Sequence, residues 1–143
     1  MSVAYFVANN QGKGRLMADV NRGSRPLSPH LTIYRPQLTS ITSILTRITG
    51  NALIIPSLLI VWWLLAAATS PEAFAFANWV LTSIFGKLIM LGSLWALWYH
   101  TFAGVRHLIW DNAVGLELDI AYKFGWIVVI GSVVMTVITL IVL

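Results

Sequence analysis

The sequence predicts an all-α integral membrane protein with three transmembrane helices. Hydrophobic residues make up 58% of its 143 residues and charged residues only 10%, whereas soluble domains carry about a quarter charged residues. Its mean hydropathy is +0.81, and three long stretches contain no Asp, Glu, Lys or Arg. These observations exclude a soluble domain. They also exclude the nucleic-acid binder that a pI of 9.9 alone would suggest.

The first element is a basic N-terminal arm, predicted over residues 1–38. It is rich in glycine and proline, which favours irregular structure. Five of the nine basic residues lie there, opposed only by Asp19, so this stretch carries the whole net charge of +4. Basic segments stay on the inner side of a membrane. We therefore expect the arm on the cytoplasmic or matrix side. The five basic residues are Lys13, Arg15, Arg22, Arg25 and Arg35.

The second element is a transmembrane domain, residues 39–143. Its uncharged runs cover residues 48–71, 88–105 and 124–143, and a bilayer core needs about 20 helical residues. Backbone groups in lipid must bond within their own segment, so the runs are helices. The predicted spans are about 40–69, 82–110 and 122–143. With the arm inside, the start of the first span and the end of the second lie at the same inner face. Between these spans, Ser70-Pro71-Glu72 predicts a helix N-cap followed by proline.

Cysteine is absent from the chain. This excludes disulfides, thiolate metal sites, iron–sulfur ligation by this chain and covalent haem attachment. Any redox cofactor must be held by histidine or by a partner.

The second span ends in HTFAGVRHLIWD, residues 100–111. Histidine inside a span is rare and usually functional. His100, Gly104, His107 and Asp111 are spaced i, i+4, i+7, i+11 and share one helix face. Two interpretations stay open: His100 ligates a haem iron, or it bonds a backbone carbonyl or a serine of a neighbouring helix. Small residues leave room beside it for a helix or a macrocycle. They are Gly92, Ala96, Ala103 and Gly104.

His107 lies about 10 Å further along the helix, so it cannot share one iron with His100. A second histidine ligand would come from another chain or from the distant His30, which indicates a hetero-oligomeric helical bundle. Arg106 and Asp111, five residues apart, are expected to form a local ion pair, and Arg106 is also within reach of a haem propionate.

The first span opens with TSITSILTRITG, residues 39–50. Ser43 and Arg47 lie one turn apart at the inner headgroup level. One interpretation is a snorkelling arginine with hydroxyls that cap backbone. The other is a quinone site, because reduction builds negative charge on the carbonyl oxygens, which a donor and a cation stabilise.

The two motifs resemble one family, the cytochrome b membrane-anchor subunit of succinate dehydrogenase (complex II). RPLSPHLTIY, residues 25–34, running into SILTRITG, residues 43–50, resembles the family's first signature, and HTFAGVRHLIWD resembles its second. The resemblance implies that His100 is an axial ligand of haem b, whose other ligand comes from a second small anchor subunit. It implies ubiquinone binding by Ser43 and Arg47, and positions near the haem propionates for Arg106 and His107.

The same resemblance implies an iron–sulfur subunit and a flavoprotein subunit as further partners. Electrons from succinate would pass through them to ubiquinone, in the tricarboxylic acid cycle and the respiratory chain, so the chain alone is not expected to be active. The membrane would be the bacterial plasma membrane or the mitochondrial inner membrane. One departure is Thr46, where many members have histidine, so a haem or proton-transfer role there is not carried over. The alternatives are a fumarate-reductase-type cytochrome b anchor and a haem-free anchor or assembly subunit.

Overall fold

The structure is a computed structural model that describes residues 34–143, and every regular element in that range is an α-helix. The chain divides after residue 35, and the helices all belong to the unit Pro36–Leu143. Nearly all of the predicted arm, including His30, lies outside the described residues. Three helical stretches are long and apolar enough to cross a membrane: Leu38–Thr69, Ile84–Asp111 and Leu118–Val142. The predicted all-α membrane fold with three spans is confirmed.

The first span is two helical segments, α2 (Leu38–Ala52) and α3 (Ile54–Thr69), that meet at Leu53. Pro56 causes the interruption, because it has no N–H to donate to the carbonyl of Ala52. The next residue, Ser57, resumes the helical pattern. Its N–H donates to the Leu53 carbonyl at 3.2 Å, and its hydroxyl donates to the same carbonyl at 2.8 Å. The continuous helix predicted over residues 40–69 is therefore broken near its middle.

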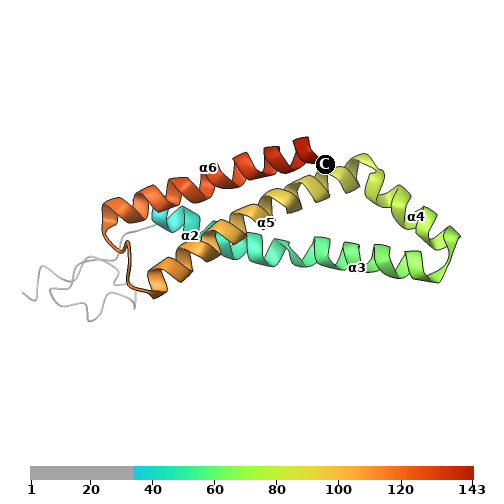
Figure 1. Ribbon diagram of the computed structural model, residues 1–143, viewed down its shortest axis with the longest axis horizontal. Coiled ribbons are helices and arrows are strands. Elements are labelled where there is room, and N and C mark those ends of the chain that lie inside the picture. Colours follow the sequence, from blue (N-terminus) through green and yellow to red (C-terminus); the bar gives the residue numbers. More distant parts are fainter. Residues whose placement is uncertain (1–33) are drawn as a thin grey trace, which may run out of the picture. The chain divides into compact units, whose positions relative to one another are not determined.

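A short helix, α4 (Pro71–Thr82), folds back from the end of α3 towards the start of α5 (Figure 1). Its N-cap is the predicted one, since the Ser70 hydroxyl accepts a 3.1 Å hydrogen bond from the N–H of Ala73. Hydrogen bonds from its own backbone N–H and from Ser70 lower the pKa of Glu72. Edge-to-face and tilted aromatic contacts join α4 to α3. These are Trp62–Phe76 at 6.2 Å and Trp63–Phe74 at 5.5 Å.

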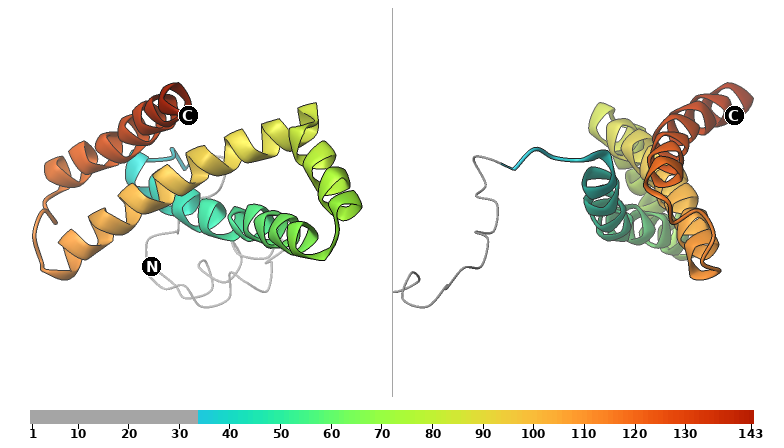
Figure 2. Two further views of the ribbon diagram at one scale, coloured as in Figure 1. Left: turned by 45° about the vertical axis from the view of Figure 1, so that its right-hand side comes forward. Right: turned by 90° about the vertical axis from the view of Figure 1, so that its left-hand side faces the viewer.

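The long helix α5 (Ile84–Asp111) crosses α2 and runs beside α6, as the two views in Figure 2 and the contacts agree. It is antiparallel to α2: Arg106 bonds Thr42, and His100 lies against Thr46 and Thr49. The start of the first span and the end of the second therefore meet at one end of the helices, as the sequence predicts.

The third span, α6 (Leu118–Val142), begins four residues before the predicted start at 122. The loop before it turns sharply at Gly115, whose φ of +73° suits glycine. A Cβ atom there would also lie 2.5 Å from the Phe124 ring. The Trp110 indole N–H donates to the Gly115 carbonyl at 3.1 Å, so the loop is tied back onto α5.

The core is small. Tyr99, Ala103 and Val128 form its buried centre, between α5 and α6. Only 11–22% of the most apolar stretch of each span is buried within this chain. Most apolar side chains therefore face outward, as expected of helices that meet lipid or other helices on most sides.

Candidate functional site

The His100 imidazole lies against α2. Its Nδ1 is 3.2 Å from the Thr46 carbonyl oxygen and 3.5 Å from the Thr49 hydroxyl oxygen. A carbonyl only accepts hydrogen bonds, and the Thr49 hydroxyl directs its own proton to the Leu45 carbonyl at 2.8 Å. Both neighbours of Nδ1 are thus acceptors, which places the proton on Nδ1. In the neutral imidazole with this tautomer the lone pair lies on Nε2, and no described residue donates a hydrogen bond to it.

The close approach of this ring depends on Gly50. A Cβ atom at Gly50 would lie 2.9 Å from Cε1 and 3.4 Å from Nδ1 of His100. The 2.9 Å distance is shorter than real Cβ atoms make to their neighbours. The His100 ring can therefore pack this closely on α2 because residue 50 has no side chain.

His100 shares its helix face with Gly104, His107 and Asp111, as predicted. We call these four residues the outward face of α5. The three polar side chains are exposed, and a Cβ atom at Gly104 would meet nothing within 4 Å. His107 contacts Trp110 edge-on, with ring centroids 5.5 Å apart. Residues 34–143 therefore leave the outward face open beside Nε2 of His100.

The small residues predicted to leave room beside His100 divide into two pairs. Gly92 and Gly104 face open space, since a Cβ atom at either would meet nothing within 4 Å. Ala96 and Ala103 are buried inside this chain. Only the two glycines are free to admit a ligand or another helix.

Ser43 and Arg47 stand on the same side of α2 as Gly50, because positions i, i+4 and i+7 share a helix face. Ser43 is half-buried and Arg47 is exposed. Within residues 34–143 neither side chain has a hydrogen-bond or ion-pair partner. The helix rise places Ser43 about 10 Å along α2 from Gly50, the residue that contacts the His100 ring.

Arg106 occupies a different face of α5. Its guanidinium is only 3% exposed; Nη1 donates to the Thr42 hydroxyl at 3.0 Å, and Cζ lies 4.7 Å from the centroid of the Trp110 ring. Nε is buried without a described hydrogen-bond partner. The expected ion pair with Asp111 is not formed, because a spacing of five residues separates the two side chains by about 140° around the helix.

Tyr99 is a site residue that the sequence interpretation missed. It is fully buried, and its hydroxyl donates to the Thr42 carbonyl at 3.1 Å. The available signal was the spacing of Tyr99, Ala103, Arg106 and Trp110, which is again i, i+4, i+7, i+11. We call these four residues the inward face of α5. Each residue of the inward face directly precedes a residue of the outward face in the sequence.

The described residues contain no cluster of three or more His, Cys, Asp or Glu side chains that could enclose a metal ion. The two histidines within residues 34–143, His100 and His107, lie about 10 Å apart along α5.

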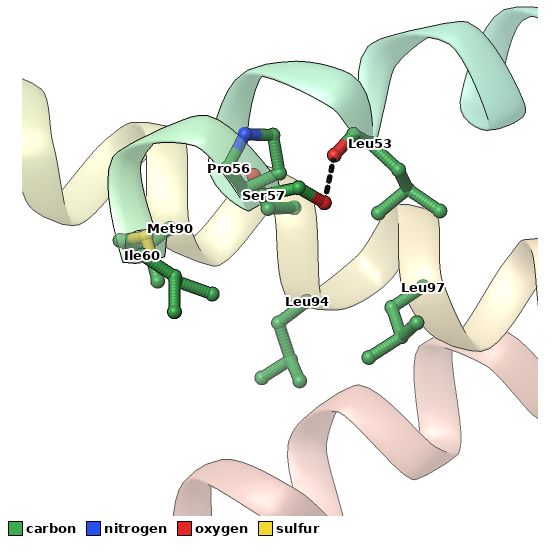
Figure 3. Close-up of a pocket in the computed structure, with 8 residues that line it drawn as sticks. Leu53, Pro56, Ser57, Ile60, Met90, Leu94 and Leu97 are labelled. Carbon is green, nitrogen blue, oxygen red and sulfur yellow. Dashed lines mark hydrogen bonds between the residues drawn. The ribbon is translucent and has the colours of Figure 1, made fainter. Parts of the chain in front are cut away.

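Between His100 and the start of α5, an apolar groove of about 220 Å³ lies between α3 and α5 (Figure 3). It lies beyond the break at Leu53, where α3 diverges from α5. Its Ser57 and Ser93 hydroxyls both donate within their own helices, at 2.8 Å and 2.6 Å. The groove therefore accepts an apolar group and offers no hydrogen-bond donor. It is lined by Leu53, Pro56, Ser57, Ile60, Met90, Ser93, Leu94 and Leu97.

Comparison with known proteins gives one consistent result. Residues 21–139 match the model of the family described as succinate dehydrogenase/fumarate reductase transmembrane subunit. The succinate dehydrogenase cytochrome b556 subunit of Paracoccus denitrificans is 60% identical over 126 residues, which cover 88% of this chain and 97% of that protein. The b556 subunit of Rickettsia conorii is 40% identical, over 79% of this chain and 88% of that protein. The b560 subunit of Reclinomonas americana is 38% identical, over 80% and 81%.

Proposed function

The chain belongs to the succinate dehydrogenase/fumarate reductase transmembrane subunit family, and we propose that His100 is an axial ligand of haem b within it. As a cytochrome b membrane anchor of complex II, the chain is one subunit of an enzyme complex. The observation that carries the proposal is that Nδ1 of His100 is bonded to the Thr46 carbonyl while Nε2, on the other side of the ring, has no partner within residues 34–143.

Metal-bound histidines usually donate their second ring N–H to a carbonyl or carboxylate, which fixes the tautomer and orients the ring. The Thr46 carbonyl does this for His100, and Gly50 lets the ring approach. The side chain of Thr46 plays no part, since its hydroxyl donates to the Thr42 carbonyl at 2.8 Å. The family signature that this segment resembles often has histidine where this chain has Thr46, but a backbone carbonyl is present whichever side chain stands there.

Haem bound in this way supplies a one-electron redox centre inside the membrane. The second axial histidine would come from the second small anchor subunit, which would cover the outward face of α5. His107 is exposed on that face and is assigned to the haem periphery, near the propionates. Arg106 is assigned to the same region. Its guanidinium is buried against α2, so it would act on the propionates through its positive charge and not by direct contact.

We further propose that Ser43 and Arg47 bind ubiquinone. The Ser43 hydroxyl would donate to a quinone carbonyl oxygen, and the Arg47 guanidinium would stabilise the negative charge that reduction builds there. Neither side chain has another partner within residues 34–143. Electrons from succinate would arrive through a flavoprotein subunit and an iron–sulfur subunit. These would dock on the cytoplasmic or matrix side of a bacterial plasma membrane or mitochondrial inner membrane.

A reduced-minus-oxidised visible spectrum of the purified complex tests the haem assignment. His100→Ala is expected to abolish the b-type absorption bands, whereas His107→Ala, which removes a histidine from the same face, is expected to retain them. A normal spectrum in His100→Ala would sink the assignment and favour a haem-free role for this chain.

Turnover with ubiquinone tests the second assignment. Ser43→Ala and Arg47→Ala are expected to raise the KM for ubiquinone and to weaken inhibition by quinone analogues, while the haem spectrum is kept. Unchanged turnover and inhibitor binding in both variants would remove the two residues from the quinone site.

A further inference from the structure

Arg106 is an unusual group to find inside a membrane domain. Its guanidinium is 3% exposed, it forms no ion pair with a described carboxylate, and its Nε has no described hydrogen-bond partner. Charged side chains in spans are costly, and those that persist generally serve a function. The contacts of Arg106 are the Thr42 hydroxyl and the Trp110 ring.

Thr42 accepts hydrogen bonds from two residues of α5. Its hydroxyl accepts from Arg106 at 3.0 Å and donates to the Thr39 carbonyl at 3.1 Å. Its carbonyl accepts from the Tyr99 hydroxyl at 3.1 Å. Thr42 is completely buried, and α6 approaches it closely at Gly125, where a Cβ atom would lie 3.8 Å from its methyl group. The start of α2 is therefore bonded to α5 through Thr42.

Besides Thr42, the contacts of the His100 ring with Thr46, Thr49 and Gly50 set the rotation of α2 about its own axis, two turns further along. The buried residues of α2 are two threonines, Thr42 and Thr49, while its isoleucines at 41, 44 and 48 are exposed. In lipid an apolar side chain is equally stable facing outward, so burial does not select one orientation. Hydrogen bonds between helices must do so.

The next residue after Thr42 is Ser43. Adjacent positions on a helix are about 100° apart, so the rotation that places Thr42 against Arg106 also sets the direction of Ser43 and, one turn on, of Arg47. We propose that Arg106 is a positioning residue for the quinone site, which acts through Thr42 to hold Ser43 and Arg47 towards the quinone. This deepens the proposed function and rests on it for the identity of the ligand.

Two measurements on the intact complex test the proposal. The first is the hydrogen exchange of residues 38–46, which reports the fastening of α2 without reference to any ligand. Thr42→Val and Arg106→Gln are expected to speed this exchange. Thr42→Ser, which keeps the hydroxyl, is expected to leave it near the wild-type rate. Thr136→Val is the matched control, because Thr136 is a buried threonine bonded only within α6, at 2.7 Å to the Ser132 carbonyl.

The second measurement is the kinetics with a short-tailed ubiquinone. Thr42→Val is expected to raise KM by about three- to eighteenfold with little change in kcat, the range that corresponds to one interhelical hydrogen bond in a membrane. Because Thr42 acts through Ser43 and Arg47, adding Thr42→Val to a variant that carries both Ser43→Ala and Arg47→Ala is expected to raise KM no further. If the Thr42→Val complex fails to assemble, the same two measurements are made on Arg106→Lys, which keeps the positive charge but lacks the planar guanidinium.

The outcomes separate the two proposals. Unchanged exchange of residues 38–46 in both variants would overturn the positioning role. A further rise in KM when Thr42→Val is added to the variant that carries both Ser43→Ala and Arg47→Ala would also overturn it. Faster exchange together with unaltered kinetics in Ser43→Ala would remove the quinone from this site while the fastening of α2 by Arg106 stands.

Discussion

The two faces of α5 carry the same pattern of residues one position apart and have opposite environments. The inward face, Tyr99–Ala103–Arg106–Trp110, bonds to α2 and to the α5–α6 loop of this chain. The outward face, His100–Gly104–His107–Asp111, leaves three polar side chains exposed along a membrane span. A shift of one residue thus divides α5 into a side that holds this chain together and a side whose polar groups need a partner or a cofactor.

After His100→Ala itself, the largest effect on the outward face is expected from Gly50→Ala. The new methyl group would lie 2.9 Å from the His100 ring, and overpacking of this kind costs about 1–3 kcal/mol. We expect haem affinity to fall about tenfold or more, measured as haem per complex after purification. Gly131→Ala, whose Cβ would make an ordinary 3.4 Å contact with Phe102, is the control. Full haem content in Gly50→Ala would contradict the placement of His100 against α2.

A Gly→Ala substitution at Gly115, the loop residue bonded to Trp110 of the inward face, should lower stability and leave the haem content unchanged. Gly115→Ala introduces a side chain at a φ of +73° and 2.5 Å from the Phe124 ring. A left-handed conformation costs about 1–2 kcal/mol for a residue other than glycine. We expect a lower thermal midpoint of the complex and normal haem content per folded complex. Haem loss without a change in thermal stability would erase the distinction between the faces.

Tyr99→Phe removes one bond from the inward face and nothing else. Interhelical hydrogen bonds in membranes contribute about 0.6 kcal/mol on average, so we expect a small decrease in unfolding free energy. The b-type spectrum should not change, although Tyr99 directly precedes His100. A shifted spectrum in this variant would show that the two faces are coupled.

The smallest effect on cofactor and turnover is expected at α4, remote from both faces. The pKa of Glu72 is lowered by hydrogen bonds from its own backbone N–H and from Ser70. A carboxylate with a lowered pKa adds stability above its unfolded pKa and loses it as pH falls through the folded value. The protection factors of the amide hydrogens in residues 70–78, which correct for the intrinsic pH dependence of exchange, should therefore decrease on acidification, and Glu72→Gln should remove that decrease. An equal decrease in Glu72→Gln would assign it to another group.

The sequence was sufficient to predict the three spans, the Ser70 cap and the shared face of His100 and His107. These follow from the absence of charge and from helical periodicity, which are local properties. The break at Leu53 was missed because the apolar composition hid the effect of Pro56. The burial of Arg106 and Tyr99 was missed for a different reason. Adjacent helix faces look alike in sequence, and only packing against Thr42 decides which face turns inward.

An experimental structure of the intact complex with haem bound tests the division of α5 most directly. We predict that Nε2 of His100 bonds the iron while Nδ1 remains on the Thr46 carbonyl. Arg106 and Tyr99 should still bond Thr42. An iron held by histidines of other chains, or an Arg106 guanidinium withdrawn from Thr42 and placed on a haem propionate, would contradict the account.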